Sequence, residues 1–175
     1  MNLRRKNMKK ITLVVLISSL VSISVVTGCG GGGGAGGSTP PPATPTKAVV
    51  KISTIGSPSA MPLIGVQATL HLPAGVTVKA SANAPQTDTN VVVASGNSVP
   101  ADLVFGVYSS GSGTVNAYVA KAAGFASGEF ATVNCDIAAG TSPTASAFSV
   151  SDLIVSDALG KLITGLSPSL SVTLQ

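Results

Sequence analysis

The sequence has little of what catalytic sites are built from. Its 175 residues include no Trp, one His and two Cys, and only 9% of the residues are charged. Catalysis needs several convergent nucleophiles, acids and bases, or a metal ion. The single histidine, His71, has no second histidine to share a metal, and no motif places a nucleophile beside it. The composition therefore argues against an enzyme, and we expect neither a cofactor nor a bound metal.

Positive charge is also scarce outside the N-terminus. Five of the ten cationic residues lie within the first ten positions. In the remainder, five lysines face six acidic residues, which leaves a net charge of −1 without a cluster of Lys or Arg. A nucleic-acid partner is therefore not expected, because such a partner requires a concentrated basic surface.

The N-terminus has the layout of a secretory signal peptide. A basic stretch is followed by an apolar run over residues 11–26 and then by small residues. As a helix, 16 residues span about 24 Å, which is less than the roughly 30 Å of a hydrocarbon core, so a permanent membrane span is disfavoured. Met8 is an alternative start that keeps Lys9 and Lys10 ahead of the same run.

Four residues at the end of this run resemble the lipobox that bacterial lipoprotein signal peptidase reads, namely Val26, Thr27, Gly28 and Cys29. The resemblance implies that residues 1–28 are removed and that Cys29 receives acyl chains. Each buried CH₂ contributes about 0.8 kcal/mol, so two or three chains anchor a soluble domain. Gly30 stands where an Asp often retains such proteins in the inner membrane, which favours the outer membrane. A secreted protein without lipid is the alternative.

Residues 29–46 form a tether between the anchor and the rest of the chain. The sequence GGGGGAGGSTPPPATPT over residues 30–46 has almost no apolar side chains with which to build a core. Its Gly-rich half is typical of a flexible coil and its Pro-rich half of a stiffer polyproline segment, with a reach of roughly 20 to 35 Å.

Residues 47–175 show the two-residue period of β-strands. Over residues 63–72, Ile64, Val66, Ala68, Leu70 and Leu72 alternate with polar or small residues. Similar alternation recurs around positions 103–107, 115–119, 131–137 and 170–174, and less regular β-type runs cover 49–55, 76–79, 91–93 and 148–155. Turn-forming sequences separate them. We predict an all-β domain, a single β-sandwich of eight or nine strands with jelly-roll or Greek-key connections.

Part of this domain resembles cohesin-like domains. The stretch GFASGEFATV at 124–133, followed by a strand and the turn SDALGK at 156–161, is similar to the C-terminal half of that family, and IGVQATL at 64–70 is similar to its opening strand. The resemblance implies a cohesin-like sandwich. Two departures, LPAGVTV at 72–78 and Leu159 in place of the usual Asn, put dockerin binding in doubt. An immunoglobulin-like sandwich is the alternative fold.

Few side chains in the domain suggest a site. Tyr108 and Tyr118 have opposite parity to the Val and Phe residues of their strands, so we expect them on the outside near one another as surface contacts. His71 is expected to be solvated and Cys135 to be a small buried apolar residue. Asp152 and Asp157 flank the last turn, where the spacing does not suit Ca²⁺ and favours Asp157 as a turn residue.

These observations favour a membrane-anchored protein of the bacterial envelope that displays a non-catalytic module for a protein partner. The scarcity of aromatic residues disfavours a polysaccharide ligand, which remains an alternative. A surface subunit that self-associates through open strand edges is a second alternative, and a hydrolase with an unrecognised site is a third.

The anchor is directly testable. Cys29→Ala removes the thiol that would carry the diacylglyceryl group, so the protein should be released from membranes or remain as an uncleaved precursor. Fractionation with metabolic lipid labelling measures both results. A variant that is still acylated and processed normally would show that the lipobox interpretation is wrong.

Overall fold

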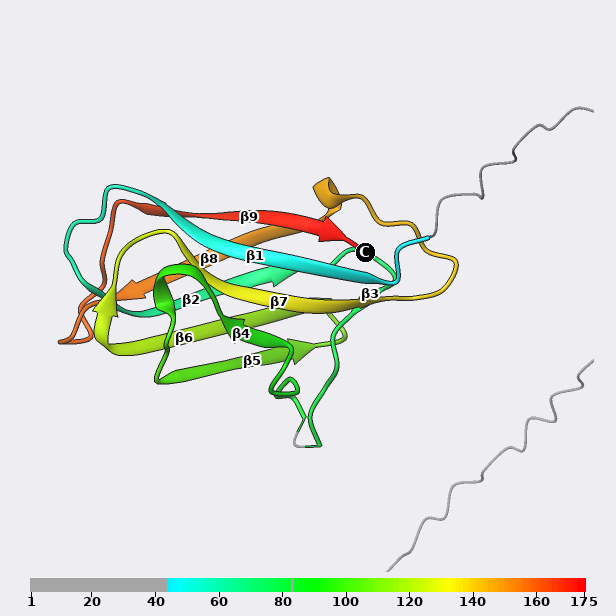
Figure 1. Ribbon diagram of the computed structural model, residues 1–175, viewed down its shortest axis with the longest axis horizontal. Coiled ribbons are helices and arrows are strands. Elements are labelled where there is room, and N and C mark those ends of the chain that lie inside the picture. Colours follow the sequence, from blue (N-terminus) through cyan, green and yellow to red (C-terminus); the bar gives the residue numbers. More distant parts are fainter. Residues whose placement is uncertain (1–43, 83) are drawn as a thin grey trace, which may run out of the picture. The chain divides into compact units, whose positions relative to one another are not determined.

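A computed structural model describes residues 44–82 and 84–175 (Figure 1). The predicted signal peptide, Val26, Thr27, Gly28, Cys29 and most of the predicted tether lie outside these residues. The described part is an all-β sandwich of two antiparallel sheets, which confirms the predicted fold class. Its nine strands are β1 (Lys47–Gly56), β2 (Leu63–His71), β3 (Val76–Thr77), β4 (Val92–Ala94), β5 (Leu103–Ser109), β6 (Thr114–Phe125), β7 (Glu129–Ile137), β8 (Ser149–Ser156) and β9 (Leu166–Leu174).

The two sheets contain strands that are distant in sequence. One sheet has the order β3-β7-β1-β9, and the other has the order β5-β6-β2-β8. In the first sheet β4 also pairs with β7, so that β3 and β4 follow one another along the same edge of β7. Two short 3-10 turns, η1 (Gly96–Ser98) and η2 (Ala145–Ala147), lie in the connections. In the described part of the chain, no helix is long and apolar enough to cross a membrane.

Alternation along β2 places one face of the strand in the core. Val66, Ala68 and Leu70 are fully buried, as the period of two predicts. At the start of the strand the prediction was wrong, because Leu63 is buried and Ile64 is only half-buried. The register of β2 against β6 shifts between Leu63 and Gly65, and this irregularity changes which side chain points inward.

The core between the sheets is built mainly from small branched side chains. Val50 and Ile52 of β1 meet the inner face of β2 and β6, where Val66 and Val119 are equally inaccessible to solvent. Phe130 is the largest fully buried side chain. The core draws its residues from the span between Ala48 and Ile163, within the described part of the chain, so the sandwich has a complete apolar interior of its own.

The ends of the domain are joined by hydrogen bonds. Lys47 and Gln175 exchange two backbone hydrogen bonds, of 3.0 Å and 2.9 Å, and the Thr46 N–H also donates to the Gln175 carbonyl. The first and last strands are therefore hydrogen-bonded neighbours in one sheet. The chain enters the sandwich at the end where β9 terminates (Figure 1). We conclude that residues 44–175 form a self-contained folding unit.

Each exposed sheet edge has a feature that opposes pairing with another strand. The β5 edge is covered by residues 85–87, whose backbone bonds Gly106 and Tyr108. The β3 and β4 strands are very short, and β8 bulges at Asp152. In the ladder of β1 with β9, hydrogen-bonded pairs alternate with non-hydrogen-bonded pairs. Lys47 and Gln175 are a hydrogen-bonded pair, so Pro168 falls in a non-hydrogen-bonded pair and its backbone nitrogen faces the open edge. Proline has no N–H to donate to another strand there.

Phe130 provides a test of the core. Phe130→Ala removes a fully buried ring and should lower the free energy of unfolding by about 3 to 5 kcal/mol. Phe105→Ala, at an exposed position, should cost about 1 kcal/mol or less. Urea denaturation of residues 44–175 measures both values, and equal losses would contradict the described core.

Candidate functional site

The solvent face of the β5-β6-β2-β8 sheet carries an uninterrupted row of large side chains. Phe105 lies opposite Tyr118, Tyr118 opposite Gln67, and Gln67 opposite Ile154, so the row crosses all four strands. At strand spacings of about 4.8 Å the row is about 14 Å long. Phe105 is 39% exposed and Ile154 47%, and Leu103, on the same face of β5, is 49% exposed. We call Leu103, Phe105, Tyr118, Gln67 and Ile154 the outer-face strip.

A ring pair forms one end of the outer-face strip. The ring centroids of Phe105 and Tyr118 are 5.0 Å apart with an interplanar angle of 35°. The Tyr118 hydroxyl reaches over Gly65, since a Cβ at Gly65 would lie 3.2 Å from that oxygen and 2.9 Å from the Ser156 Oγ. The glycine therefore leaves room for the Tyr118 ring to lie against the sheet, which limits the ring's freedom before any partner binds.

The predicted pairing of Tyr108 with Tyr118 is wrong. Tyr108 lies opposite Val115, which is fully buried, and the Tyr108 ring packs against the core. Phe105 takes its place on the outside. Gly106 explains the reversal, because a Cβ at this inward position would lie 2.5 Å from Val92 and 2.7 Å from Thr87. The inner face of β5 therefore has room only for glycine at this position, and Leu103 and Phe105, which have the opposite parity, lie outside.

A bulge in β8 completes the outer-face strip at its other end. Asp152 and Leu153 both lie opposite Ala68, since Thr69 pairs with Ser151 and Gln67 with Ile154. Asp152 has φ +52°, a left-handed conformation that Asp tolerates better than most residues. The extra residue turns Leu153 toward the core and Ile154 toward solvent.

His71 lies on the same face and contacts a serine, which in turn contacts a carboxylate. Its Nε2 is 2.8 Å from the Ser151 Oγ, and that hydroxyl donates to Asp152 Oδ2 at 2.8 Å. In a catalytic triad the histidine lies between the serine and the carboxylate. Here the serine lies between the other two and its hydroxyl donates its hydrogen bond to Asp152, so the histidine does not accept that proton. The cluster is a polar border beside the outer-face strip.

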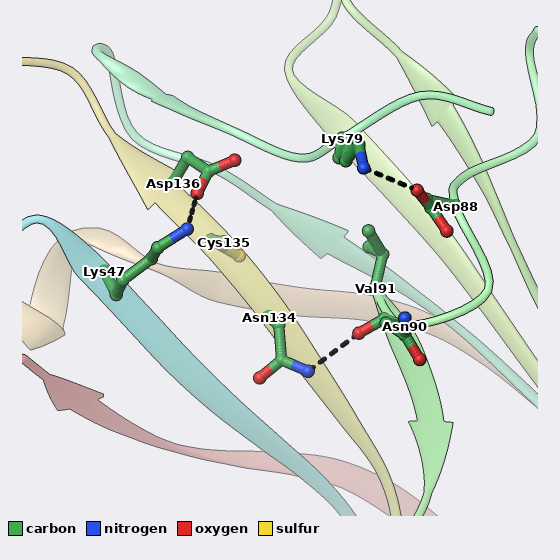
Figure 2. Close-up of a pocket in the computed structure, with 8 residues that line it drawn as sticks. All are labelled: Lys47, Lys79, Asp88, Asn90, Val91, Asn134, Cys135 and Asp136. Carbon is green, nitrogen blue, oxygen red and sulfur yellow. Dashed lines mark hydrogen bonds and ion pairs between the residues drawn. The ribbon is translucent and has the colours of Figure 1, made fainter. Parts of the chain in front are cut away.

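A polar pocket of about 220 Å³ lies on the opposite side of the sandwich (Figure 2). Its lining residues come from β1, β7 and the segment between β3 and β4, and they are Lys47, Lys79, Asp88, Asn90, Val91, Asn134, Cys135 and Asp136. Their charges are paired across the pocket. Lys47 bonds Asp136, Lys79 bonds Asp88 at 2.9 Å, and the Asn134 amide donates to the Asn90 carbonyl at 2.9 Å. The pocket is therefore polar, with its formal charges neutralised internally.

Cys135 behaves as the sequence predicts. Its side chain is almost fully buried, and burial, with a smaller effect from the Asp136 charge, raises the pKa of the thiol to about 12. Thiols with a raised pKa are unreactive near neutral pH, because the thiolate is the nucleophile. The residue is a small apolar element of the core.

Asp157 is a turn residue, as predicted. Its Oδ1 accepts the backbone N–H groups of Leu159 and Lys161, each at 2.9 Å. Within residues 44–82 and 84–175, no group of three or more His, Cys, Asp or Glu side chains is arranged to hold a metal ion.

Comparison with family models, with curated proteins and with solved structures finds no match for this chain. The site is therefore argued from its own geometry. Sequence reasoning identified Tyr118 but missed Phe105, because its parity was assigned to the core, and missed Ile154, because the run over residues 148–155 has no regular alternation that predicts a face. The signal that marks them is the pair Gly65 and Gly106, whose missing side chains leave room on one face of each strand.

The Lys79–Asp88 pair gives a pH-dependent prediction. The hydrogen bond and charge of Lys79 hold the pKa of Asp88 below its ordinary value of 3.8. A carboxylate with a lowered pKa stabilises the fold above its unfolded pKa, and this contribution is lost as the pH falls through the folded value. Lys79→Met should raise the pKa of Asp88 toward 3.8, as measured by NMR titration of the carboxyl carbon.

Lys121→Met is the matched control, since that ammonium bonds the Val99 carbonyl. It should leave the Asp88 titration unchanged. An unaltered Asp88 pKa in Lys79→Met would contradict the ion pair.

Proposed function

We propose that the chain is a lipid-anchored protein of the bacterial envelope, in the outer membrane, whose cohesin-like sandwich is a non-catalytic module that binds a protein partner. The outer-face strip is the observation that carries the proposal. Contiguous apolar side chains on the solvent face of a sheet are typical of interaction sites, whereas isolated ones are common on any surface.

The composition of the strip suits a protein surface. Leu103, Phe105 and Tyr118 form its apolar part, and the polar Gln67 separates them from Ile154 at the other end. Hydrogen-bonded polar groups border the strip, including Thr69 with Asn116 at 2.7 Å and His71 with Ser151. Protein interfaces commonly have an apolar centre and a polar rim. The 35° tilt between the two rings gives no broad flat platform for a sugar, although the half-buried Tyr118 ring keeps a polysaccharide as the alternative ligand.

The anchor and tether supply the mechanism of display. Acylation at Cys29 would hold the domain at the membrane, and the tether over residues 30–46 would let it turn toward a partner. Confinement of this kind raises the effective concentration of the domain for any partner at the same surface.

Self-association through strand edges receives less support. Residues 85–87, the Asp152 bulge and Pro168 each interrupt an edge along which a second strand would have to pair. These features are typical of a sandwich that does not pair with another copy along its sheet edges.

Affinity capture with variants tests the proposal. Immobilised residues 30–175, without Cys29, should retain a protein from envelope and secreted fractions at moderate salt. Phe105→Ser combined with Tyr118→Ala removes the ring pair and should reduce retention at least about tenfold, because interface aromatic residues contribute much of the binding energy.

Ile55→Ser is the matched control, because Ile55 is similarly exposed but belongs to β1 of the other sheet. It should leave retention unchanged. Equal losses in both variants, or no retention by the unaltered domain, would contradict the proposal, and retention of glycan alone would support the polysaccharide alternative.

A further inference from the structure

Two loops form the end of the sandwich opposite the entry of the chain. Residues 57–62 join β1 to β2 and residues 157–165 join β8 to β9, and Figure 1 shows both at the end farthest from Lys47 and the C-terminus. The loops are tied together, because the Ser59 N–H donates to the Thr164 carbonyl at 2.8 Å and the Thr164 N–H to the Ser59 Oγ at 2.9 Å. We call these two loops the tip.

A rigid turn at the tip presents a fully projecting leucine. Leu159 is 92% exposed. The turn beneath it is held by four hydrogen bonds, two to the Asp157 carboxylate and two between backbone groups of Asp157, Gly160 and Lys161. Gly160 has φ +74°, which glycine adopts without strain. The leucine is therefore an apolar knob whose backbone is already ordered, so little further entropy is lost when it binds.

A shallow pocket lined largely by aliphatic residues, with polar as well as apolar surface exposed in it, includes Leu162, three residues after Leu159 in the chain. Its volume is about 280 Å³, and it is lined by Leu153, Ile154, Val155, Leu162, Ile163, Thr164, Gly165 and Leu166. Leu162, on its rim, is 64% exposed. A cavity of about 150 Å³ accommodates benzene, so this volume suffices for one leucine side chain.

The knob and the pocket share residues 157–165, and we propose that the tip is a self-complementary contact in which Leu159 of one copy enters the pocket of a second copy. A twofold axis makes the same insertion twice and closes the assembly. Because the tip lies at the end remote from Lys47, the two copies would meet head to head. The pocket is lined in part by the edge strands β8 and β9 and shares Ile154 with the outer-face strip, but the contact involves no backbone pairing along those edges, and Leu159 is not part of the strip.

The charges at the tip favour a second copy over a lipid surface. Lys161 is the one cation in residues 157–165, and the Asp157 carboxylate on the same turn balances it. Helices and loops that insert into membranes combine apolar residues with several cations and frequently with aromatic residues. A twofold contact between two neutral turns places no surplus of like charge together.

Analytical ultracentrifugation of residues 44–175 tests the contact. At protein concentrations up to about 1 mM we expect a reversible monomer–dimer equilibrium, with the weak affinity that is typical of small contacts. Leu159→Ser should raise the dimer dissociation constant at least about tenfold through the lost apolar burial. The fold should persist, since the side chain makes no core contact, and circular dichroism checks this.

Leu103→Ser is the matched control. Leu103 is a half-exposed leucine on β5, three strands from β8 and therefore about 14 Å away. It should leave dimerisation unchanged and act only on capture of the partner, so the two proposals fail separately. A strictly monomeric domain, or equal weakening by both substitutions, would overturn the self-contact.

A photo-cross-linking amino acid at position 159 extends the test to the full chain in membranes. A dimer cross-linked to residues 153–166 supports the contact. Cross-links from position 159 exclusively to other proteins, to lipid or to other parts of a second copy overturn it.

Discussion

Burial of small branched side chains between the two sheets is the interaction on which the rest of the domain depends. Valine and alanine fill most inward positions of β1, β2, β6 and β7, and Phe130 is the largest residue wholly inside. Small residues pack well only where strand registers are held, because a shift of one residue turns every side chain to the other face. The ladders of β1 with β7 and of β2 with β6 therefore fix both the core and the outer surface.

Local departures from regular pairing give the sandwich its distinctive surface. The shift near Leu63 and the bulge at Asp152 each change which residues point outward. Gly65 and Gly106 act in the same direction, because each leaves space that a neighbouring side chain occupies. The result is a row of large, mainly apolar side chains on one solvent face, with Gln67 within it and hydrogen-bonded polar groups beside it. An exposed surface of this kind lowers the solubility of the domain, and a bound partner would counter this effect by removing the surface from water.

The two ends of the domain differ in character. At one end, Lys47 and Gln175 join the first and last strands by backbone hydrogen bonds. The charged side chains of the polar pocket near Lys47 are paired with one another. At the other end, the ordered Asp157 turn projects Leu159, and the pocket that includes Leu162 is lined largely by aliphatic residues. With the proposed anchor at Cys29, a domain of this kind would be suited to contacts made away from its attachment point.

The sequence by itself determined the all-β class, a count of eight or nine strands with their approximate positions, the burial of Cys135 and the turn at Asp157, because a period of two and turn-forming residues are local signals. It also gave the prediction of a lipidated Cys29, which lies outside the described residues. Which face of β5 is buried was decided by the tertiary structure. Phe105 and Tyr108 exchange their expected sides because Thr87 and Val92 press against Gly106 from segments that pairing brings close. The register between distant strands, which no local pattern specifies, placed Phe105 beside Tyr118 and Ser151 beside His71.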